Sequence, residues 1–259
     1  MTTVARPVAV KLGVVGKGGV GKTTVSGLLA RAYSELGRRV VAIDTDSNPN
    51  LGLSLGLSLS ETEAVPVLPR AVLVGSGSAM SATTLVSEFG RPTPAGPTLL
   101  SAIRVSDAGA GCTCSGHATV RSLLSEALAD VDVTLVDMEA GLEHLSRSGG
   151  TLAYADVLVV VCEPTRKSVL TAARTASLAA ELGIPHVVAV GNKVRSAQEA
   201  EFLLGALAAE NIATAGVLTF DEHIAESDRV GTVGLHPVTA DALETINAVV
   251  AAVDTLVGP

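Results

Sequence analysis

Two patterns of hydrophobic positions alternate along the chain. Short uninterrupted apolar runs, typical of strands buried on both faces, are separated by segments in which apolar residues recur every three or four positions, as on one face of a helix. The apolar runs cover residues 8–15, 40–44, 131–136, 155–161, 186–190 and 213–218. The helical segments cover residues 25–36, 120–128, 168–182, 198–209 and 239–256. This alternation predicts an α/β fold with a mostly parallel sheet and helices on both faces.

The pattern weakens between residues 58 and 111, where Pro, Gly, Ser and Thr become frequent. Short strand-like runs at residues 71–74 and 99–105 interrupt this stretch. Because long structureless loops are uncommon in compact domains, we interpret the stretch as a loop-rich insertion that carries a functional surface. No internal repeat or domain boundary is visible, so residues 1–259 are expected to form one domain.

The first apolar run leads into a glycine-rich turn with the spacing Gly16-x-x-x-x-Gly21-Lys22-Thr23, a full match to the Walker A motif. Glycines let successive backbone N–H groups turn inward around a phosphate, and the following helix adds the positive end of its dipole. We expect Lys22 to reach the β- and γ-phosphates and the Thr23 hydroxyl to ligate Mg²⁺. The predicted nucleotide-binding residues of this turn are Gly18, Gly19, Val20, Gly21, Lys22, Thr23 and Thr24.

A second lysine, Lys17, directly follows the first glycine of this motif. The resulting sequence Lys-Gly-Gly-Val-Gly-Lys-Thr-Thr resembles the deviant Walker A motif of the MinD, ParA and nitrogenase iron protein class of ATPases. The resemblance implies a homodimer that sandwiches two nucleotides. In such a dimer Lys17 reaches the phosphates bound by the partner, so that Lys17 and Lys22 both take part in ATP hydrolysis.

Two further strands end in carboxylates. Asp44 closes one apolar run and Asp46 follows it in a polar loop, while Asp137 closes another run in the Walker B pattern. In a parallel α/β sheet, ligands bind beyond the carboxyl ends of the strands, so these side chains lie beside the phosphate loop if their strands are neighbours. Phosphoryl transfer to water requires a group that positions the water and carboxylates that hold Mg²⁺.

The family resemblance suggests how these carboxylates divide the work. Asp46 is the candidate for orienting the attacking water, and Asp44 and Asp137 are the candidates for the Mg²⁺ shell. The sequence also allows the assignments of Asp44 and Asp46 to be reversed, and simple turn formation is the alternative explanation for the acidic loop. Residues 137–141 occupy the place of the family's switch II, a turn whose glycine N–H meets the γ-phosphate.

A dipeptide after another predicted strand, Asn192-Lys193, resembles the base-contacting motif of P-loop proteins. The Asn192 amide can donate to and accept from the edge of a purine. No aspartate stands two residues after Lys193, as it usually does in guanine-binding proteins, so ATP is the expected nucleotide.

Two cysteines, Cys112 and Cys114, form a Cys-x-Cys pair on a glycine-flanked stretch before a predicted helix. Thiols in such a position are exposed and readily deprotonated. Two thiolates supply half of a closed tetrahedral site, and a symmetric dimer that brings two pairs to its axis completes it. Soft thiolates favour Zn²⁺, Ni²⁺ or Cu⁺ over Mg²⁺. A structural zinc staple and an iron–sulfur scaffold are the alternative interpretations.

Two other candidate ligands have simpler explanations. His117 is a further candidate ligand, but we expect it to cap the helix after the cysteine pair or to face solvent. Cys162 continues an apolar run and is expected to be a small core residue.

The amino-acid composition limits the classes of partner that we expect this protein to bind. With 18 basic and 26 acidic residues the formal net charge is −8, which gives no attraction to nucleic acid or anionic lipid. No signal peptide and no run of about 20 apolar residues is visible. We therefore expect a cytoplasmic protein that binds neither nucleic acid nor membrane.

Several segments together resemble the CooC family, the ATPases that help to load nickel into carbon monoxide dehydrogenase. They are the Walker A sequence, the Cys-x-Cys pair, residues 137–147 (Asp-Met-Glu-Ala-Gly-Leu-Glu-His-Leu-Ser-Arg) and residues 192–195 (Asn-Lys-Val-Arg). The resemblance implies that Cys112 and Cys114 are metal ligands, that two such pairs share one Ni²⁺ or Zn²⁺ at a homodimer interface, and that the client is a metalloenzyme such as carbon monoxide dehydrogenase.

One segment departs from the family pattern, and one rival function remains. The family often has an acid and proline after its second switch I aspartate, whereas this chain has Ser47-Asn48-Pro49.

The rival is a positioning or partition ATPase like MinD or ParA. Residues 210–259 hold eight acids and one basic residue, Arg229, which differs from a basic membrane-binding helix or a DNA-binding face.

Overall fold

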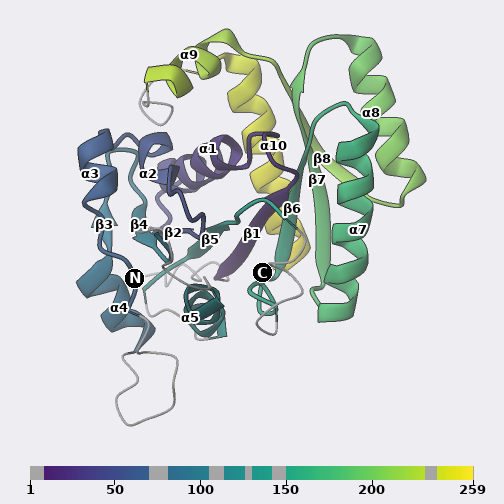
Figure 1. The fold of residues 1–259 in the computed structure, drawn as a ribbon. Helices are drawn as coiled ribbons and strands as arrows, with labels where there is room; N and C mark the ends of the chain where they lie inside the picture. The colour runs from purple at the N-terminus through teal and green to yellow at the C-terminus, as the bar shows by residue number, and fades with distance from the viewer. Residues whose placement is uncertain are drawn as a thin grey trace, which may run out of the picture.

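The computed structural model describes residues 9–69, 81–104, 114–125, 130–141, 150–230 and 238–258, with the backbone alone at 114–116, 118, 227 and 228. Within these residues, eight strands form one sheet in the order β3-β4-β2-β5-β1-β6-β7-β8 (Figure 1). The strands are β1 (Val10–Gly16), β2 (Val40–Asp44), β3 (Arg91–Pro92), β4 (Thr98–Ser101), β5 (Val133–Asp137), β6 (Val157–Cys162), β7 (His186–Val194) and β8 (Ala213–Thr219). Neighbouring strands are parallel except β3 and β4, which are antiparallel. The predicted fold class is confirmed.

Helices cover both faces of the sheet (Figure 1). They are α1 (Lys22–Glu35), α2 (Leu51–Ser54), α3 (Leu59–Glu63), α4 (Ala82–Phe89), α5 (Cys114–Ser125), α7 (Arg166–Leu182), α8 (Ala197–Ala209), α9 (Glu222–Val230) and α10 (Ala240–Val257). Leu29 of α1 and Val249 of α10 belong to one hydrophobic core. Leu123 of α5 and Leu203 of α8 belong to a second core. The sheet therefore lies between two apolar layers, which are built mainly from Val, Leu and Ala because only 2% of the residues are aromatic.

The central strands end together at one edge of the sheet. β1 pairs with β5 on one side and with β6 on the other, and β5 also pairs with β2. All residues of β2, β5 and β6 are buried, which explains their continuous apolar runs. The glycine-rich turn after β1 and the polar loops after β2 and β5 therefore emerge side by side.

The structure extends the sequence prediction in several places. β7 continues through Asn192 and Lys193 to Val194, although the apolar run stops at residue 190. Within the predicted insertion, β4 pairs with β2 and is part of the sheet, and the short helices α3 and α4 were not expected. The acidic helix α9 was also not expected from the sequence. The single-domain organisation stays a prediction.

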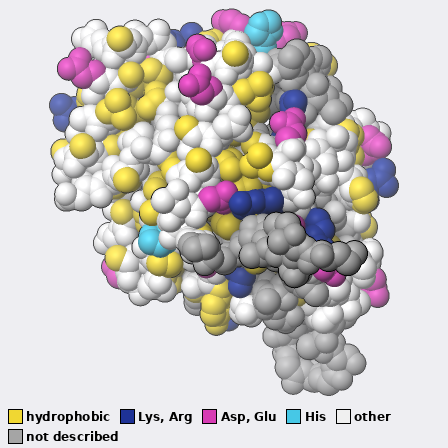
Figure 2. Space-filling view, turned by 180° about the vertical axis from the view of Figure 1, so that it is seen from behind, with side chains coloured by type: hydrophobic (Ala, Val, Ile, Leu, Met, Phe, Trp, Pro, Cys, Tyr) yellow, Lys and Arg dark blue, Asp and Glu magenta, His cyan; other side chains and the backbone are white. Residues whose placement is uncertain are grey.

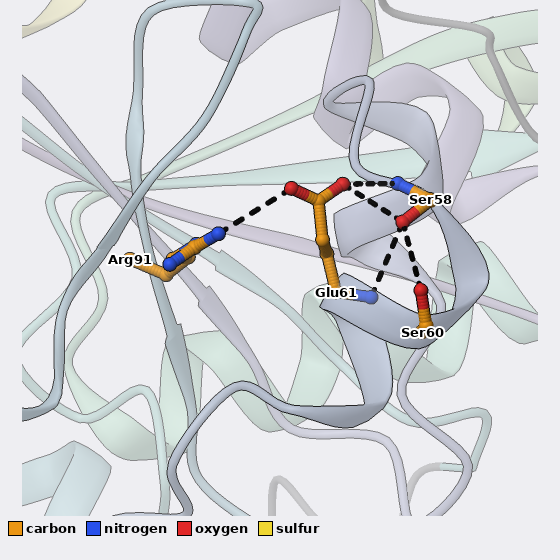
Figure 3. A network of polar contacts seen from close by, with 4 residues as sticks. All are labelled: Ser58, Ser60, Glu61 and Arg91. Atoms are coloured by element: carbon orange, nitrogen blue, oxygen red, sulfur yellow. Dashed lines mark hydrogen bonds and ion pairs between the residues drawn. The ribbon is translucent and has the colours of Figure 1, made fainter.

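The short helix α3 is stabilised at its first turn by a capping box. The Ser58 hydroxyl accepts a hydrogen bond from the backbone N–H of Glu61 at 3.3 Å, and the Glu61 carboxylate accepts one from the backbone N–H of Ser58 at 2.9 Å. Arg91 of β3 donates to the same carboxylate at 3.4 Å, as Figure 3 shows. The Ser-x-x-Glu spacing is the sequence signal for this helix start.

Two of the simpler expectations can be compared with the structure. Cys162 is fully buried in a hydrophobic core, as predicted, and burial raises the pKa of its thiol to about 11. The expectation for His117 was wrong, because this residue is the fourth of α5 and only 4% exposed, so it neither caps the helix nor faces solvent.

The surface carries interspersed charges. On the face shown in Figure 2, the described Lys and Arg side chains lie singly or in small groups among acidic ones. Among the described helices, none combines the length and the apolar character needed to cross a lipid bilayer.

Candidate functional site

The phosphate loop connects β1 to α1 with a backbone that only glycine adopts easily. Gly16, Gly19 and Gly21 have φ values of 148°, 84° and 91°. Gly21 immediately precedes α1, and a Cβ atom there would lie 2.4 Å from Nδ2 of Asn192. The Walker A spacing thus corresponds to a turn whose main chain must approach another strand closely.

A cavity of about 500 Å³ opens at this loop, within the usual range of small-molecule sites. Its wall includes residues from the phosphate loop, the loop and helix after β2, the loop after β5, and the end of β7. The lining residues are Gly18, Gly19, Gly21, Lys22, Thr23, Thr24, Asp46, Asn50, Leu53, Ser54, Ala140 and Lys193. The structure therefore brings most of the predicted nucleotide-binding residues to one cavity, together with Asp46.

Lys22 is only 8% exposed although it carries an ammonium group. Its Nζ atom lies 3.4 Å from the backbone oxygen of Lys17, to which it donates. Burial lowers the pKa of Lys22, and the negative charges of Asp137, Asp46 and Glu139 act in the opposite direction. Because Lys22 lines the cavity, its ammonium group can neutralise the charge of a phosphate bound there.

The predicted base-contacting residues Asn192 and Lys193 both donate hydrogen bonds to the main chain of the phosphate loop. Nδ2 of Asn192 donates to the backbone oxygen of Val20 at 2.8 Å, and Nζ of Lys193 donates to the backbone oxygen of Gly19 at 2.6 Å. Lys193 also forms an ion pair with Glu163 at 3.2 Å. The sequence predicts contacts between this pair and the base, whereas no sequence pattern indicated their hydrogen bonds to the loop.

The Walker B aspartate lies buried behind the loop. Asp137 is 2% exposed, and its Oδ1 atom accepts a hydrogen bond from Ser26 at 2.9 Å. The Thr23 side chain also hydrogen bonds to it. Burial raises the pKa of Asp137, and these hydroxyl groups counteract the rise. Ser26 was missed from the sequence, although a serine one turn after Thr23 on the apolar face of α1 was a signal.

Asp44 lies beside Asp137 and holds the loop that follows β2. The two residues face each other in the register of β2 and β5. The carboxylate of Asp44 accepts the backbone N–H groups of Asp46 at 3.0 Å and Leu51 at 2.9 Å, one on each oxygen. Burial and the neighbouring Asp137 raise its pKa. Asp44 therefore fixes both ends of the polar loop, while Asp46 lines the cavity.

The loops after β2 and β5 are connected by hydrogen bonds on both sides of Asp46. On one side, the Thr45 hydroxyl donates to the backbone oxygen of Asp137 at 2.8 Å and accepts from the backbone N–H of Glu139 at 3.4 Å. On the other, the Ser47 hydroxyl donates to Oε1 of Glu139 at 2.9 Å. No sequence pattern pointed to these contacts, because they depend on β2 and β5 being neighbours.

The remaining predicted residues are less completely described. Lys17 lies exposed at the tip of the phosphate loop. Cys112 lies outside the described residues, and Cys114 begins α5 without a described side chain. In the part of the chain that the structure describes, no group of three or more His, Cys, Asp or Glu residues is arranged to hold a metal. The thiol site stays a prediction.

Comparison with known proteins gives concordant results. Residues 14–233 match the family model of the CobQ/CobB/MinD/ParA nucleotide binding domain. The carbon monoxide dehydrogenase accessory protein CooC of Rhodospirillum rubrum is 36% identical over 96% of this chain and 98% of its own length. An uncharacterised ATP-binding protein of Methanocaldococcus jannaschii is 32% identical over 85% of this chain and 89% of its own. MinD of Pyrococcus horikoshii, solved with Mg-ADP, superposes with a TM-score of 0.73 at 20% identity, covering 97% of this chain and 98% of that one.

Proposed function

Because the chain belongs to the CooC family within the CobQ/CobB/MinD/ParA class of P-loop ATPases, we propose that it is an ATP-driven metal-insertion factor for a metalloenzyme. The observation that carries the proposal is the 36% identity to a carbon monoxide dehydrogenase accessory protein along almost the whole of both chains. The protein is an ATP hydrolase, and we propose that it uses ATP for metal insertion.

ATP occupies the cavity at the phosphate loop, with its phosphates against residues 18–24. Lys22 contacts the β- and γ-phosphates, and Asn192 and Lys193 hold the loop and contact the base. The hydroxyl of Thr23 and the carboxylate of Asp137 fit a magnesium ion, because both are hard oxygen donors and they lie within hydrogen-bonding distance of each other. Bound Mg²⁺ neutralises charge on the phosphates during transfer.

Asp46 orients the attacking water. Among the carboxylates of the site it is the one that lines the cavity, whereas both oxygens of Asp44 accept main-chain hydrogen bonds. This favours Asp46 for the water and leaves Asp44 as a support of the Mg²⁺ shell.

The active form is a homodimer. Lys17 is exposed at the loop tip, where it is accessible to a second copy of the chain and to the phosphates bound there. ATP binding in the two copies then brings the Cys112 and Cys114 pairs together at the dimer axis, where four thiolates complete a tetrahedral site for Ni²⁺ or Zn²⁺. Hydrolysis opens the dimer and releases the metal to a client such as carbon monoxide dehydrogenase, in the cytoplasm.

The test is metal binding by the purified apo-protein with ATP, with ADP and without nucleotide, combined with size-exclusion chromatography. We expect one Ni²⁺ or Zn²⁺ per two chains, with an affinity that depends on the nucleotide and is lost in the Cys112→Ala/Cys114→Ala variant. Cys162→Ala is the matched control, since it removes a thiol from the hydrophobic core, and it should keep the metal. Equal affinity in all nucleotide states would contradict the coupling, because linkage requires ATP and metal to affect each other equally.

The same preparation separates this function from the rival one. Absence of specific metal binding, together with ATP-dependent co-sedimentation with lipid vesicles or DNA, would identify a positioning ATPase of the MinD or ParA kind. A coloured protein after anaerobic purification would identify an iron–sulfur scaffold.

A further inference from the structure

We propose that Glu139 is a positioning residue for Asp46 and that it acts through the hydroxyl of Ser47. The inference rests on the proposed function, in which Asp46 orients the attacking water. In this role Glu139, in the loop after β5, holds in place the part of the loop after β2 that contains Asp46.

Asp46 lies between two residues whose hydroxyl groups both contact the loop after β5. Thr45, on the strand side, is fully buried, and its hydroxyl donates to the backbone oxygen of Asp137. Ser47, on the outer side, donates to the Glu139 carboxylate at 2.9 Å. The Thr45 contact uses the main chain of the partner loop, whereas the Ser47 contact depends on one side chain, Glu139.

The Ser47–Glu139 hydrogen bond matters because the loop beyond Asp46 is exposed. Asn48 and Asn50 are exposed, and the carboxylate of Asp46 itself accepts the backbone N–H of Asn48 at 2.9 Å. Asp44 fixes the loop at Asp46 and again at Leu51. Between these anchors, the Ser47–Glu139 hydrogen bond ties the described loop to the neighbouring strand's loop. Without it, Asp46 keeps its backbone anchor and loses the constraint on its outer side.

We expect Glu139 to act through a neighbouring residue and not by direct contact with the nucleotide. The cavity wall includes its neighbour Ala140 and does not include Glu139. The negative charge of Glu139 does reach Lys22, where it favours the ammonium form less strongly than Asp137 and Asp46 do. The side chain is thus close enough to organise the site, and its Oε1 atom accepts a hydrogen bond from the Ser47 hydroxyl.

The test compares ATP turnover and ATP affinity in five variants of the whole chain. Ser47→Ala and Glu139→Ala should each lower kcat about tenfold, the order expected when one hydrogen bond to a charged group is lost, and leave the Kd for ATP within about twofold. Glu139→Gln retains an acceptor oxygen and Ser47→Thr retains a donor, so both should recover most of kcat. The Ser47→Ala/Glu139→Ala double variant should be no slower than Glu139→Ala alone, because Glu139→Ala already removes the Ser47–Glu139 hydrogen bond.

Other outcomes would overturn the inference. If Glu139 contacted the reacting atoms directly, Glu139→Gln would be as slow as Glu139→Ala, and Ser47→Ala would resemble the wild type. If the pair were only structural, kcat and Kd would deteriorate in parallel with a lower Tm. Ser60→Ala, on the exposed side of α3, is the matched serine control and should change neither quantity.

Asp46→Asn distinguishes failure of this inference from failure of the proposed function. If Asp46→Asn abolishes hydrolysis while Ser47→Ala and Glu139→Ala turn over ATP like the wild type, the positioning role of Glu139 is wrong and the role of Asp46 stands. If Asp46→Asn hydrolyses ATP normally, the role of Asp46 in the proposed function is wrong, and the inference built on it also fails.

Discussion

Asp44 and Asp137 occupy paired positions on the neighbouring parallel strands β2 and β5, each as the last residue of its strand. Both carboxylates are almost fully buried. Burial raises the pKa of Asp44 from 3.8 to about 7, with a further contribution from the charge of Asp137, and it raises the pKa of Asp137 from 3.8 to about 6. The ligand-free protein therefore holds two acidic groups in an environment that disfavours their charge.

We predict that the ligand-free protein becomes less stable as the pH rises from 5 to 7.5. In this range the unfolded chain has already released these protons, whereas the folded protein must lose them from buried carboxylates. A folded-state pKa above the unfolded value gives stability that is present at low pH and is lost as the pH passes the folded pKa. The loss in free energy of unfolding should be on the order of 2–4 kcal/mol, measured by urea denaturation at each pH.

Asp137→Asn provides the comparison for this prediction. It removes one titrating group and also the negative charge that raises the pKa of Asp44, so the difference in stability between the two pH values should fall by at least half. A wild-type protein with the same stability at both pH values, or a variant with an equally steep dependence, would contradict the assignment. Mg²⁺ with ATP should reduce the dependence in the wild type, since the cation favours the charged carboxylates.

A second prediction concerns Gly21, which combines a left-handed backbone with a close approach to Asn192. Gly21→Ala should lose ATP binding, measured with a fluorescent ATP analogue, and should lower Tm, because its Cβ would lie 2.4 Å from Nδ2 of Asn192. Gly37→Ala is the matched control. Gly37 has a similar φ of 77° with no atom within 4 Å of the added Cβ, so it should suffer only the backbone strain of about 1 kcal/mol and bind ATP normally. Equal effects of the two substitutions would show that strain, not contact with Asn192, makes Gly21 necessary.

The sequence was informative where the physical signal is local. The glycine spacing before Lys22 predicted the tight turn between β1 and α1, and the apolar runs that end in Asp44 and Asp137 predicted the central strands and the edge of the sheet where they meet. These features follow from backbone sterics and from the burial of strands on both faces. Both effects restrict the residue types at adjacent positions in the sequence.

The contacts that organise the site were not visible in this way. Whether Ser47 reaches Glu139 depends on the pairing of β2 with β5, and the two residues are 92 positions apart. Asn192 contacts Val20 across 172 positions because β7 continues beyond its apolar run. Both are specific long-range hydrogen bonds made by polar residues, whose types alone are equally compatible with exposed turns.

The last prediction separates the two roles of Asn192. If its amide holds the phosphate loop through the backbone oxygen of Val20, Asn192→Ala should weaken binding of inorganic tripolyphosphate as well as ATP, each by about fivefold, the order expected for one lost hydrogen bond. If Asn192 contacts only the base, tripolyphosphate affinity should be unchanged while ATP affinity falls. Titration calorimetry of both ligands with the wild type, Asn192→Ala and the exposed helix variant Asn247→Ala measures this directly. A larger loss for ATP than for tripolyphosphate, with both significant, would show that the same amide supports the loop and recognises the base.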